Sequence, residues 1–82
     1  MSRDDVLDLM RSVLHQIAPE AELDDVGPGE GLREALDLDS IDFLNFVIGI
    51  HEKTGIEIPE RDYPELATVE GCVSYLASRA SG

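Results

Sequence analysis

Residues 40–54 restrict the fold of this sequence more than any other segment, because the helix that they predict carries apolar side chains on most of its circumference. The segment follows Asp39, a favourable N-cap residue, and ends before Gly55, a common helix stop. Its polar or small residues are spaced by three, four and three and so form one narrow stripe: Asp42, Asn45, Gly49 and Glu52. We therefore expect a central helix, contacted on several sides.

Two amphipathic helices are predicted before and after this segment. The first starts at Ser2, with Asp5 three residues later as in a capping box, and ends near Ala18 because Pro19 disfavours helical geometry before it. Its apolar stripe consists of Val6, Met10, Val13 and Ile17, widened by Leu7 and Leu14. The last helix is capped by Thr68, and its inward positions are Val69, Cys72, Val73, Leu76 and Ala80.

The connecting segments complete an all-α prediction. Residues 19–39 are irregular and rich in glycine, with Leu32, Leu36 and Leu38 pinning them to the core through one short helical turn at residues 32–36. Residues 56–59 form an extended link, and residues 62–66 form a brief helix or a turn. The prediction is a small four-helix bundle in which residues 1–82 form a single domain, with three main helices, a short third helix and a long loop between helices one and two.

The charge of the chain excludes several classes of partner. Eighteen acidic residues against six basic ones give a formal net charge of −12 over 82 residues. Nucleic acid and anionic membrane surfaces would repel such a chain, whereas proteins with basic patches would attract it. Like charge also disfavours self-association, so we expect a monomer. The alternative is that the acidity only keeps a small protein in solution.

Cys72 is the only cysteine, which excludes an internal disulfide and a paired-cysteine metal or redox site. It lies on the apolar face of the last helix, so we interpret it as a small buried hydrophobe. His15 and His51 have no metal-ligand spacing, and we expect no metal site. The first residues lack an apolar leader and no run is long enough to span a bilayer, so the expected location is the cytoplasm.

Ser40 stands in Leu36-Asp37-Leu38-Asp39-Ser40-Ile41-Asp42, where the long loop meets the central helix. A helix start is exposed and favours an anion, because its N–H groups lack partners and its dipole is positive there. No base or oxyanion-hole pattern surrounds this serine, so we expect it to be the substrate of another enzyme and the chain to be no enzyme itself. The competing interpretation is that Ser40 only helps Asp39 cap the helix.

The chain resembles the acyl carrier protein family, whose attachment motif is commonly written Leu-Gly-X-Asp-Ser-Leu. The resemblance includes the leading amphipathic helix, the long loop, Asp39-Ser40 opening an apolar helix, the link Ile56-Glu57-Ile58-Pro59, and the start of the last helix at Thr68-Val69. This order of parts is far more specific than the serine motif alone. It implies a free-standing member that carries acyl groups as thioesters between enzymes of fatty acid, polyketide or related acyl metabolism.

The resemblance implies a covalent cofactor, 4′-phosphopantetheine, moved from coenzyme A onto Ser40 by a phosphopantetheinyl transferase with a magnesium ion bound by the transferase complex. Asp39 and Asp42 match the positions that flank the attachment serine. Ile41 and Asn45 are expected on the accessible side where acyl-transferring, ligase or synthase enzymes dock. Members of the family can also fold the acyl chain into the interior, for which the candidate wall residues are Leu44, Val47, Ile48, Ile58, Leu66 and Val73.

Three departures from the family pattern concern the partners more than the attachment. Asp37 replaces the usual glycine and Ile41 replaces leucine. Fatty-acid carriers usually present an acidic face on the second helix, which is diluted here by Asn45, Gly49, His51 and Lys53. A dedicated carrier of a specialised pathway therefore fits as well as the housekeeping carrier of fatty acid synthesis. The alternatives are an aminoacyl or peptidyl carrier and an acidic interaction module that carries nothing.

Gly49 also has two interpretations. It lies in the polar stripe of the central helix, where it costs about 1 kcal/mol of helix propensity relative to alanine. Either a partner backbone or a neighbouring loop approaches it closely, or it is a tolerated surface glycine.

Overall fold

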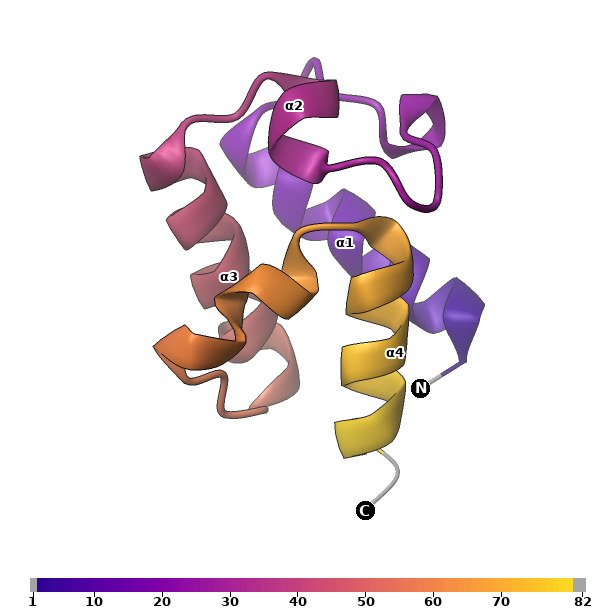
Figure 1. The fold of residues 1–82 in the computed structure, drawn as a ribbon, viewed down its shortest axis with the longest axis vertical. Helices are drawn as coiled ribbons and strands as arrows, with labels where there is room; N and C mark the ends of the chain where they lie inside the picture. Colours follow the sequence, from indigo (N-terminus) through magenta and orange to yellow (C-terminus); the bar gives the residue numbers. More distant parts are fainter. Residues whose placement is uncertain (1, 81–82) are drawn as a thin grey trace.

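The structure, a computed structural model, describes residues 2–80 and is built of helices joined by loops (Figure 1). The main helices are α1 (Arg3–Ile17), α3 (Ser40–Thr54) and α4 (Val69–Ala80). Between them lie the short helix α2 (Leu32–Leu36) and two 3-10 helices, η1 (Leu23–Asp25) and η2 (Glu60–Leu66). Residues 2–80 contain no β-strand, only an isolated bridge between Gly31 and Thr68. The predicted all-α bundle is confirmed, with η2 as its short third helix.

The helix boundaries follow from local capping. α1 begins with a capping box in which the Asp5 N–H donates to Ser2 Oγ over 3.1 Å. α3 begins and ends where its caps predict, after Asp39 and before Gly55, whose φ of 74° is left-handed. At the start of α4 the Gly71 N–H donates to Thr68 Oγ1 over 3.0 Å. These ends were predictable because each depends on residues within a few positions of it.

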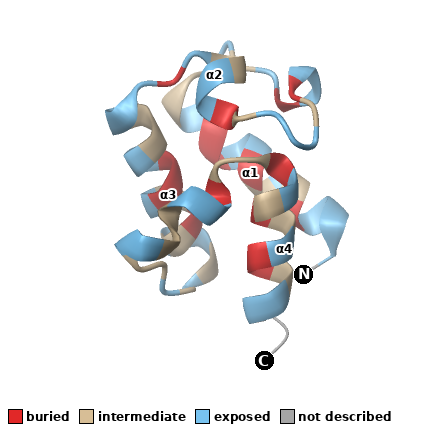
Figure 2. Ribbon diagram, viewed as in Figure 1, coloured by how far each residue is buried: buried red, intermediate tan, exposed pale blue. Residues whose placement is uncertain are grey.

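The core lies where α1, α3 and α4 face one another (Figure 2). The sixteen buried hydrophobic residues include four from α1, three from α3 and four from α4: Val6, Met10, Val13, Leu14, Phe46, Val47, Ile50, Val69, Cys72, Tyr75 and Leu76. Leu7, Ile17 and Val73 are only partly buried, so they form the edge of the core. The burial of Tyr75, which donates its hydroxyl hydrogen to Asp62 over 2.8 Å, was not predicted, and the side chain of Ala80 lies outside the described part.

One face of α3 is not covered by the rest of the chain. Ile41, Leu44 and Ile48 follow one another at spacings of three and four residues and are 69%, 41% and 42% exposed. α3 lies at the edge of the bundle in Figure 1, with α1 behind it and η2 beside its later half. The expectation of a helix contacted on several sides is therefore only partly met, because no further helix is available to cover this face.

The long loop before α3 is tied to the opposite side of the bundle. The Leu32 N–H donates to the Ala67 carbonyl over 2.7 Å, and the Glu70 N–H donates to the Pro28 carbonyl over 3.2 Å. Leu32 and Leu38 are buried as predicted, and Leu36 is partly buried. Leu23 and Val26 are also buried, which was not predicted because they belong to no periodic pattern. The loop is thus held at several points and gives α2 a defined place.

Gly49 lets α1 and α3 approach each other closely. A Cβ atom built on Gly49 would lie only 2.7 Å from Val13 Cγ1, shorter than any ordinary carbon–carbon contact. The glycine is therefore needed by packing within the chain. Both earlier interpretations are corrected: the neighbour is helix α1, and the position is no freely tolerated surface glycine.

Cys72 is completely buried on α4, as the sequence predicted. Its thiol donates to the carbonyl oxygen of Leu66 over 3.3 Å. Burial raises the pKa of this thiol to about 12, because the thiolate would lose its hydration in the core.

Candidate functional site

Ser40 is the first residue of α3 and is exposed to solvent. The preceding residue, Asp39, is the N-cap, and its carboxylate accepts from the Asp42 N–H over 2.8 Å. Asp42 completes the box, since its carboxylate accepts from the Asp39 N–H over 3.5 Å. The two flanking acids therefore cap the helix between them, and the Ser40 hydroxyl takes no part in it. This decides against the interpretation of Ser40 as a capping residue.

The Ser40 hydroxyl instead accepts a hydrogen bond from Arg33, over 3.1 Å between Oγ and Nη2. Arg33 lies on α2, seven residues earlier in the chain, and is also exposed. Because the guanidinium only donates, the serine keeps its own hydrogen for another acceptor. The structure thus places one permanent cation directly beside the serine.

Asp37 makes the turn that connects α2 to the serine. It caps the C-terminus of α2 in the left-handed conformation, with φ 54° and ψ 45°, a region that glycine adopts more easily than any other residue. The Asp37 and Leu38 N–H groups both donate to the Arg33 carbonyl. This geometry gives a physical reason why the related motif usually has glycine here, and it shows that aspartate fulfils the same role in this chain.

The site contains no group that would activate the serine for catalysis. Among residues 2–80, the only side chain recorded in a hydrogen bond with Ser40 Oγ is that of Arg33, which is always protonated and cannot act as a base. His51 lies in the last turn of α3, where its Nδ1 is 2.7 Å from the Ile56 carbonyl oxygen. The arrangement fits a serine that is modified by another protein, because its hydroxyl is exposed but not deprotonated by a neighbour.

Two of the predicted contact residues lie near Ser40 on the open side of α3. Ile41 is the most exposed large hydrophobic residue, at 69%, and Asn45 is exposed one turn further along. Together with Leu44 and Ile48, Ile41 forms the uncovered face of α3. Ser40, Ile41 and Asn45 are therefore all exposed in the first two turns of α3, and the role that the family resemblance implies for Ile41 and Asn45 stays a prediction.

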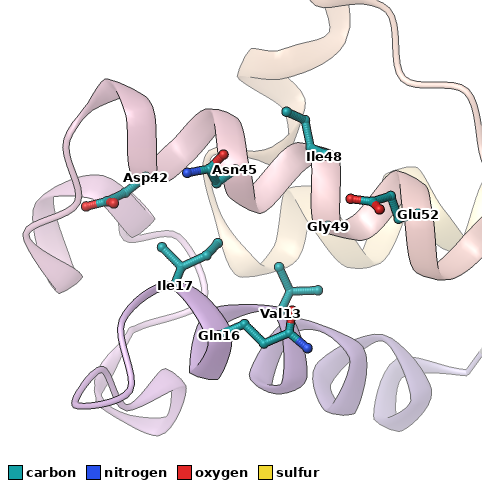
Figure 3. A pocket seen from close by; sticks show the side chains of 8 residues that line it. All are labelled: Val13, Gln16, Ile17, Asp42, Asn45, Ile48, Gly49 and Glu52. Atoms are coloured by element: carbon teal, nitrogen blue, oxygen red, sulfur yellow. The ribbon is translucent and has the colours of Figure 1, made fainter.

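The polar stripe of α3 faces a groove along α1 (Figure 3). The groove has a volume of about 340 Å³, and its α3 side is formed by Asp42, Asn45, Ile48, Gly49 and Glu52. Val13, Gln16 and Ile17 of α1 form the opposite side. Gly49 of the stripe thus lies at the boundary with α1, while Asn45 and Glu52 remain exposed along the groove.

The six candidate wall residues of an acyl cavity do not share one environment. Val47 and Leu66 are buried, Ile58 and Val73 are partly buried, and Leu44 and Ile48 are exposed. Val47, Ile48 and Ile58 line a shallow depression of about 120 Å³ between α3 and the segment leading into η2. His51, Glu57 and Tyr63 complete its rim. The described part of the chain therefore holds a small opening at this place.

Residues 2–80 contain neither a metal-binding cluster nor a membrane-spanning helix. No cluster of three or more histidine, cysteine, aspartate or glutamate side chains in this range is arranged to hold a metal ion. Within the same range, no helix combines the length and the apolar character that crossing a membrane requires.

Arg33 is the residue at this site that sequence reasoning missed. It is the only basic residue between Glu20 and Asp42, in a stretch that is otherwise rich in acids. This isolation is the sequence feature that could have pointed to a role for Arg33. Its distance of seven residues from Ser40 concealed the contact, because only the turn at Asp37 brings the two side chains together.

Comparison with known proteins agrees with this geometry. A family model described as the phosphopantetheine attachment site matches residues 4–76. The acyl carrier protein of Renibacterium salmoninarum is 35% identical over 81 residues, covering 94% of each chain. That of Thermobifida fusca is 30% identical over 77 residues, covering 92% of this chain and 94% of the relative. The acyl carrier protein of Acidothermus cellulolyticus is 28% identical over 78 residues, covering 95% and 92%.

Proposed function

Because the chain belongs to the acyl carrier protein family, whose members are carriers and not enzymes, we propose that Ser40 is its attachment serine. The family's attachment domain bears 4′-phosphopantetheine. The residues at the start of α3 fit that group, since an exposed hydroxyl lies at the first helical position with a guanidinium 3.1 Å away. The exposed hydroxyl, which takes no part in the cap formed by Asp39 and Asp42, is the observation that carries the proposal.

Attachment requires a partner because the chain itself lacks the means. Ser40 Oγ forms a bond to the phosphorus of the pantetheine phosphate while the phosphoanhydride bond of coenzyme A breaks. Adenosine 3′,5′-bisphosphate leaves, and a base of the transferase takes the serine proton. The chain contributes an accessible nucleophile, fixed by the rigid first turn of α3. Once attached, the arm supplies a terminal thiol that holds acyl groups as thioesters. The family implies a phosphopantetheinyl transferase and acyl-handling enzymes as partners.

The docking surface in this proposal is the open side of α3 around Ile41 and Asn45. Ile41 offers an apolar contact beside the attachment point, and Leu44 and Ile48 extend it along the helix. Asp37, Asp39 and Asp42 surround the serine with negative charge, which favours partners that have basic residues near their active-site entrance. Such partners would associate more slowly at high ionic strength.

The depression lined by Val47, Ile48 and Ile58 is the proposed entry for an acyl chain that folds into the bundle. Leu66 lies deeper and Val73 lies at the edge of the core. At about 120 Å³ the depression accommodates only a few methylene groups without movement of η2. A long acyl chain would therefore have to separate η2 from α3.

Intact mass measurement tests the attachment. The protein is incubated with coenzyme A and a broad-specificity transferase, and the wild type is expected to gain one phosphopantetheinyl group. Ser40→Ala should gain none, whereas the control Ser12→Ala, which alters an exposed serine of α1, should gain as much as the wild type. No gain by the wild type alongside a functioning reference carrier would refute the proposal, and an equal gain by Ser40→Ala would refute the residue.

The class of cargo is proposed to be acyl, in fatty acid, polyketide or related metabolism. The holo protein can be offered to a malonyl transferase with malonyl-coenzyme A and, separately, to an amino-acid-activating enzyme with ATP. Loading with malonyl alone supports the acyl proposal. Loading with the amino acid alone would overturn it in favour of an aminoacyl or peptidyl carrier. Ile41→Glu should slow malonyl loading more than Glu57→Gln, a change near η2.

A further inference from the structure

We propose that Arg33 binds the phosphodiester of the arm on Ser40 and thereby holds the root of the arm against α2. The inference rests on the proposed attachment at Ser40 and goes beyond it by assigning a residue outside the attachment motif. Its basis is the hydrogen bond of 3.1 Å between Arg33 Nη2 and Ser40 Oγ. The phosphorus atom would be bonded directly to that oxygen, so its other oxygens would come within reach of the same guanidinium.

Arg33 differs in its partners from three of the four other arginines of the chain. Arg3, Arg11 and Arg79 each form an ion pair with a carboxylate, at 2.6, 2.8 and 3.6 Å. Within residues 2–80 Arg33 forms no such pair, although Glu34, Asp37 and Asp39 are close in sequence. A cation surrounded by acids that contacts a neutral hydroxyl instead remains available for an anion at that hydroxyl.

The backbone around Arg33 fixes the position of this residue near Ser40. Its carbonyl oxygen accepts from the N–H groups of Asp37 and Leu38, which close the C-terminal turn of α2. The preceding residue, Leu32, is completely buried and its N–H is bonded to Ala67. α2 is therefore hydrogen-bonded at both ends, and the residue that carries the guanidinium is held on the same side as Ser40.

The chemistry of the group suits this role. A guanidinium presents several donors in a planar fork that matches phosphate oxygens. Asp39 and Asp42 place negative charge beside Ser40, which opposes the favourable effect of the helix start on a phosphodiester there. Arg33 would offset that repulsion and restrict the first bonds of the arm. We therefore expect Arg33 to matter more after attachment than before it.

Thermal unfolding of the apo and holo forms tests the inference, using wild type, Arg33→Gln, Arg33→Lys and Arg61→Gln. Arg61, on η2, is a matched control because it too is exposed and forms no ion pair within the described residues. At low salt the change in Tm from apo to holo should be about 2–5 °C less favourable in Arg33→Gln than in the wild type. Arg61→Gln should behave as the wild type, and Arg33→Lys should retain part of the effect.

Phosphorus NMR of the holo proteins gives a second readout that a purely structural role would not move. The phosphodiester resonance should shift in Arg33→Gln relative to the wild type and remain unchanged in Arg61→Gln. Raising the ionic strength should reduce the difference between wild type and Arg33→Gln in both measurements, because the pair is exposed and screened by salt.

The outcomes separate this inference from the proposed attachment. A wild type that gains no mass overturns the attachment and the inference with it. A wild type that gains the group, with an equal apo-to-holo Tm change and phosphorus shift in Arg33→Gln, overturns the inference alone. An equal loss of stability in the apo and holo forms of Arg33→Gln would also overturn it, because Arg33 would then stabilise only the fold.

Discussion

The two helices of fifteen residues, α1 and α3, begin with the same capping box, yet only one of these starts leaves a serine available. In α1 the serine is the N-cap itself, and Ser2 Oγ is used by the Asp5 N–H. In α3 an aspartate fills that position, and the serine stands one residue later. A shift of one position therefore separates a hydroxyl that caps its helix from one that takes no part in the cap.

The residue after the cap has a different use in each helix. In α1 it is Arg3, which pairs with Glu70 at 2.6 Å and ties the helix to α4. In α3 it is Ser40, which points to the solvent side and receives a hydrogen bond from Arg33. The comparison teaches that the cap only exposes this position, and that the surrounding tertiary structure decides whether it holds the bundle together or serves a ligand.

Exchanging each serine for alanine should give opposite results. Ser40→Ala is expected to lose attachment completely while its free energy of unfolding changes by less than about 0.5 kcal/mol. Ser2→Ala is expected to keep attachment and lose about 1 kcal/mol, because it removes the N-cap. Intact mass and urea unfolding measure the two effects. Loss of attachment in both variants would contradict the distinction between the two helix starts.

The contact between the two helices is tested at Gly49. Gly49→Ala places a methyl group against Val13 and should lower stability by about 1–2 kcal/mol, despite the better helix propensity of alanine. Gly29→Ala, where a Cβ meets nothing within 4 Å, is the control and should be nearly neutral. In a Val13→Ala background the cost of Gly49→Ala should shrink, and an unchanged cost in the double variant would show that the helices are not in contact here.

Asp39 can be changed to make the start of α3 resemble that of α1. Asp39→Ala should cost about 1 kcal/mol in urea unfolding, since the Asp42 N–H loses its acceptor. Asp39→Ser restores a side-chain oxygen and should remain within about 0.5 kcal/mol of the wild type. Equal losses in both variants would indicate that the negative charge, and not the cap, is what α3 requires.

Asp37 gives the smallest expected effect. Its left-handed conformation disfavours any residue with a Cβ, so Asp37→Gly should stabilise the protein by about 0.5 kcal/mol after the greater chain entropy of unfolded glycine is subtracted. Gly55→Ala, at φ 74°, is the reverse change and should destabilise it by about 1 kcal/mol. Thermal unfolding measures both, and a destabilising Asp37→Gly would show that the aspartate side chain supports the turn.

Much of this fold could be predicted because its signals are local. The bounds of α3 follow from Asp39 and Gly55, and the short turn of α2 was expected at the residues where it occurs. Ser40 was predicted at the start of this helix, and its proposed role came from the family resemblance of the whole chain. Each of these features depends on a few neighbouring residues, so no knowledge of the tertiary structure was needed.

The rest depends on how the helices meet. Periodicity showed that α3 is apolar on most sides but could not tell which side the chain leaves uncovered, so the exposure of Ile41 and Ile48 was not foreseen as one face. The reason for a glycine at position 49 is visible only once the position of Val13 on α1 is known. The contact between Arg33 and Ser40 could not be predicted because it depends on the left-handed turn at Asp37. Sequence patterns assign that geometry to glycine.

The burial of Cys72 has a consequence for the reactivity of the whole chain. A thiol whose pKa is about 12 is almost entirely protonated near neutral pH, and only the thiolate attacks a thioester or an alkylating reagent. The chain's own sulfur therefore cannot intercept an acyl group bound to an arm on the surface. In the folded holo protein an alkylating reagent should label a single thiol, that of the arm, and acyl exchange should be confined to it.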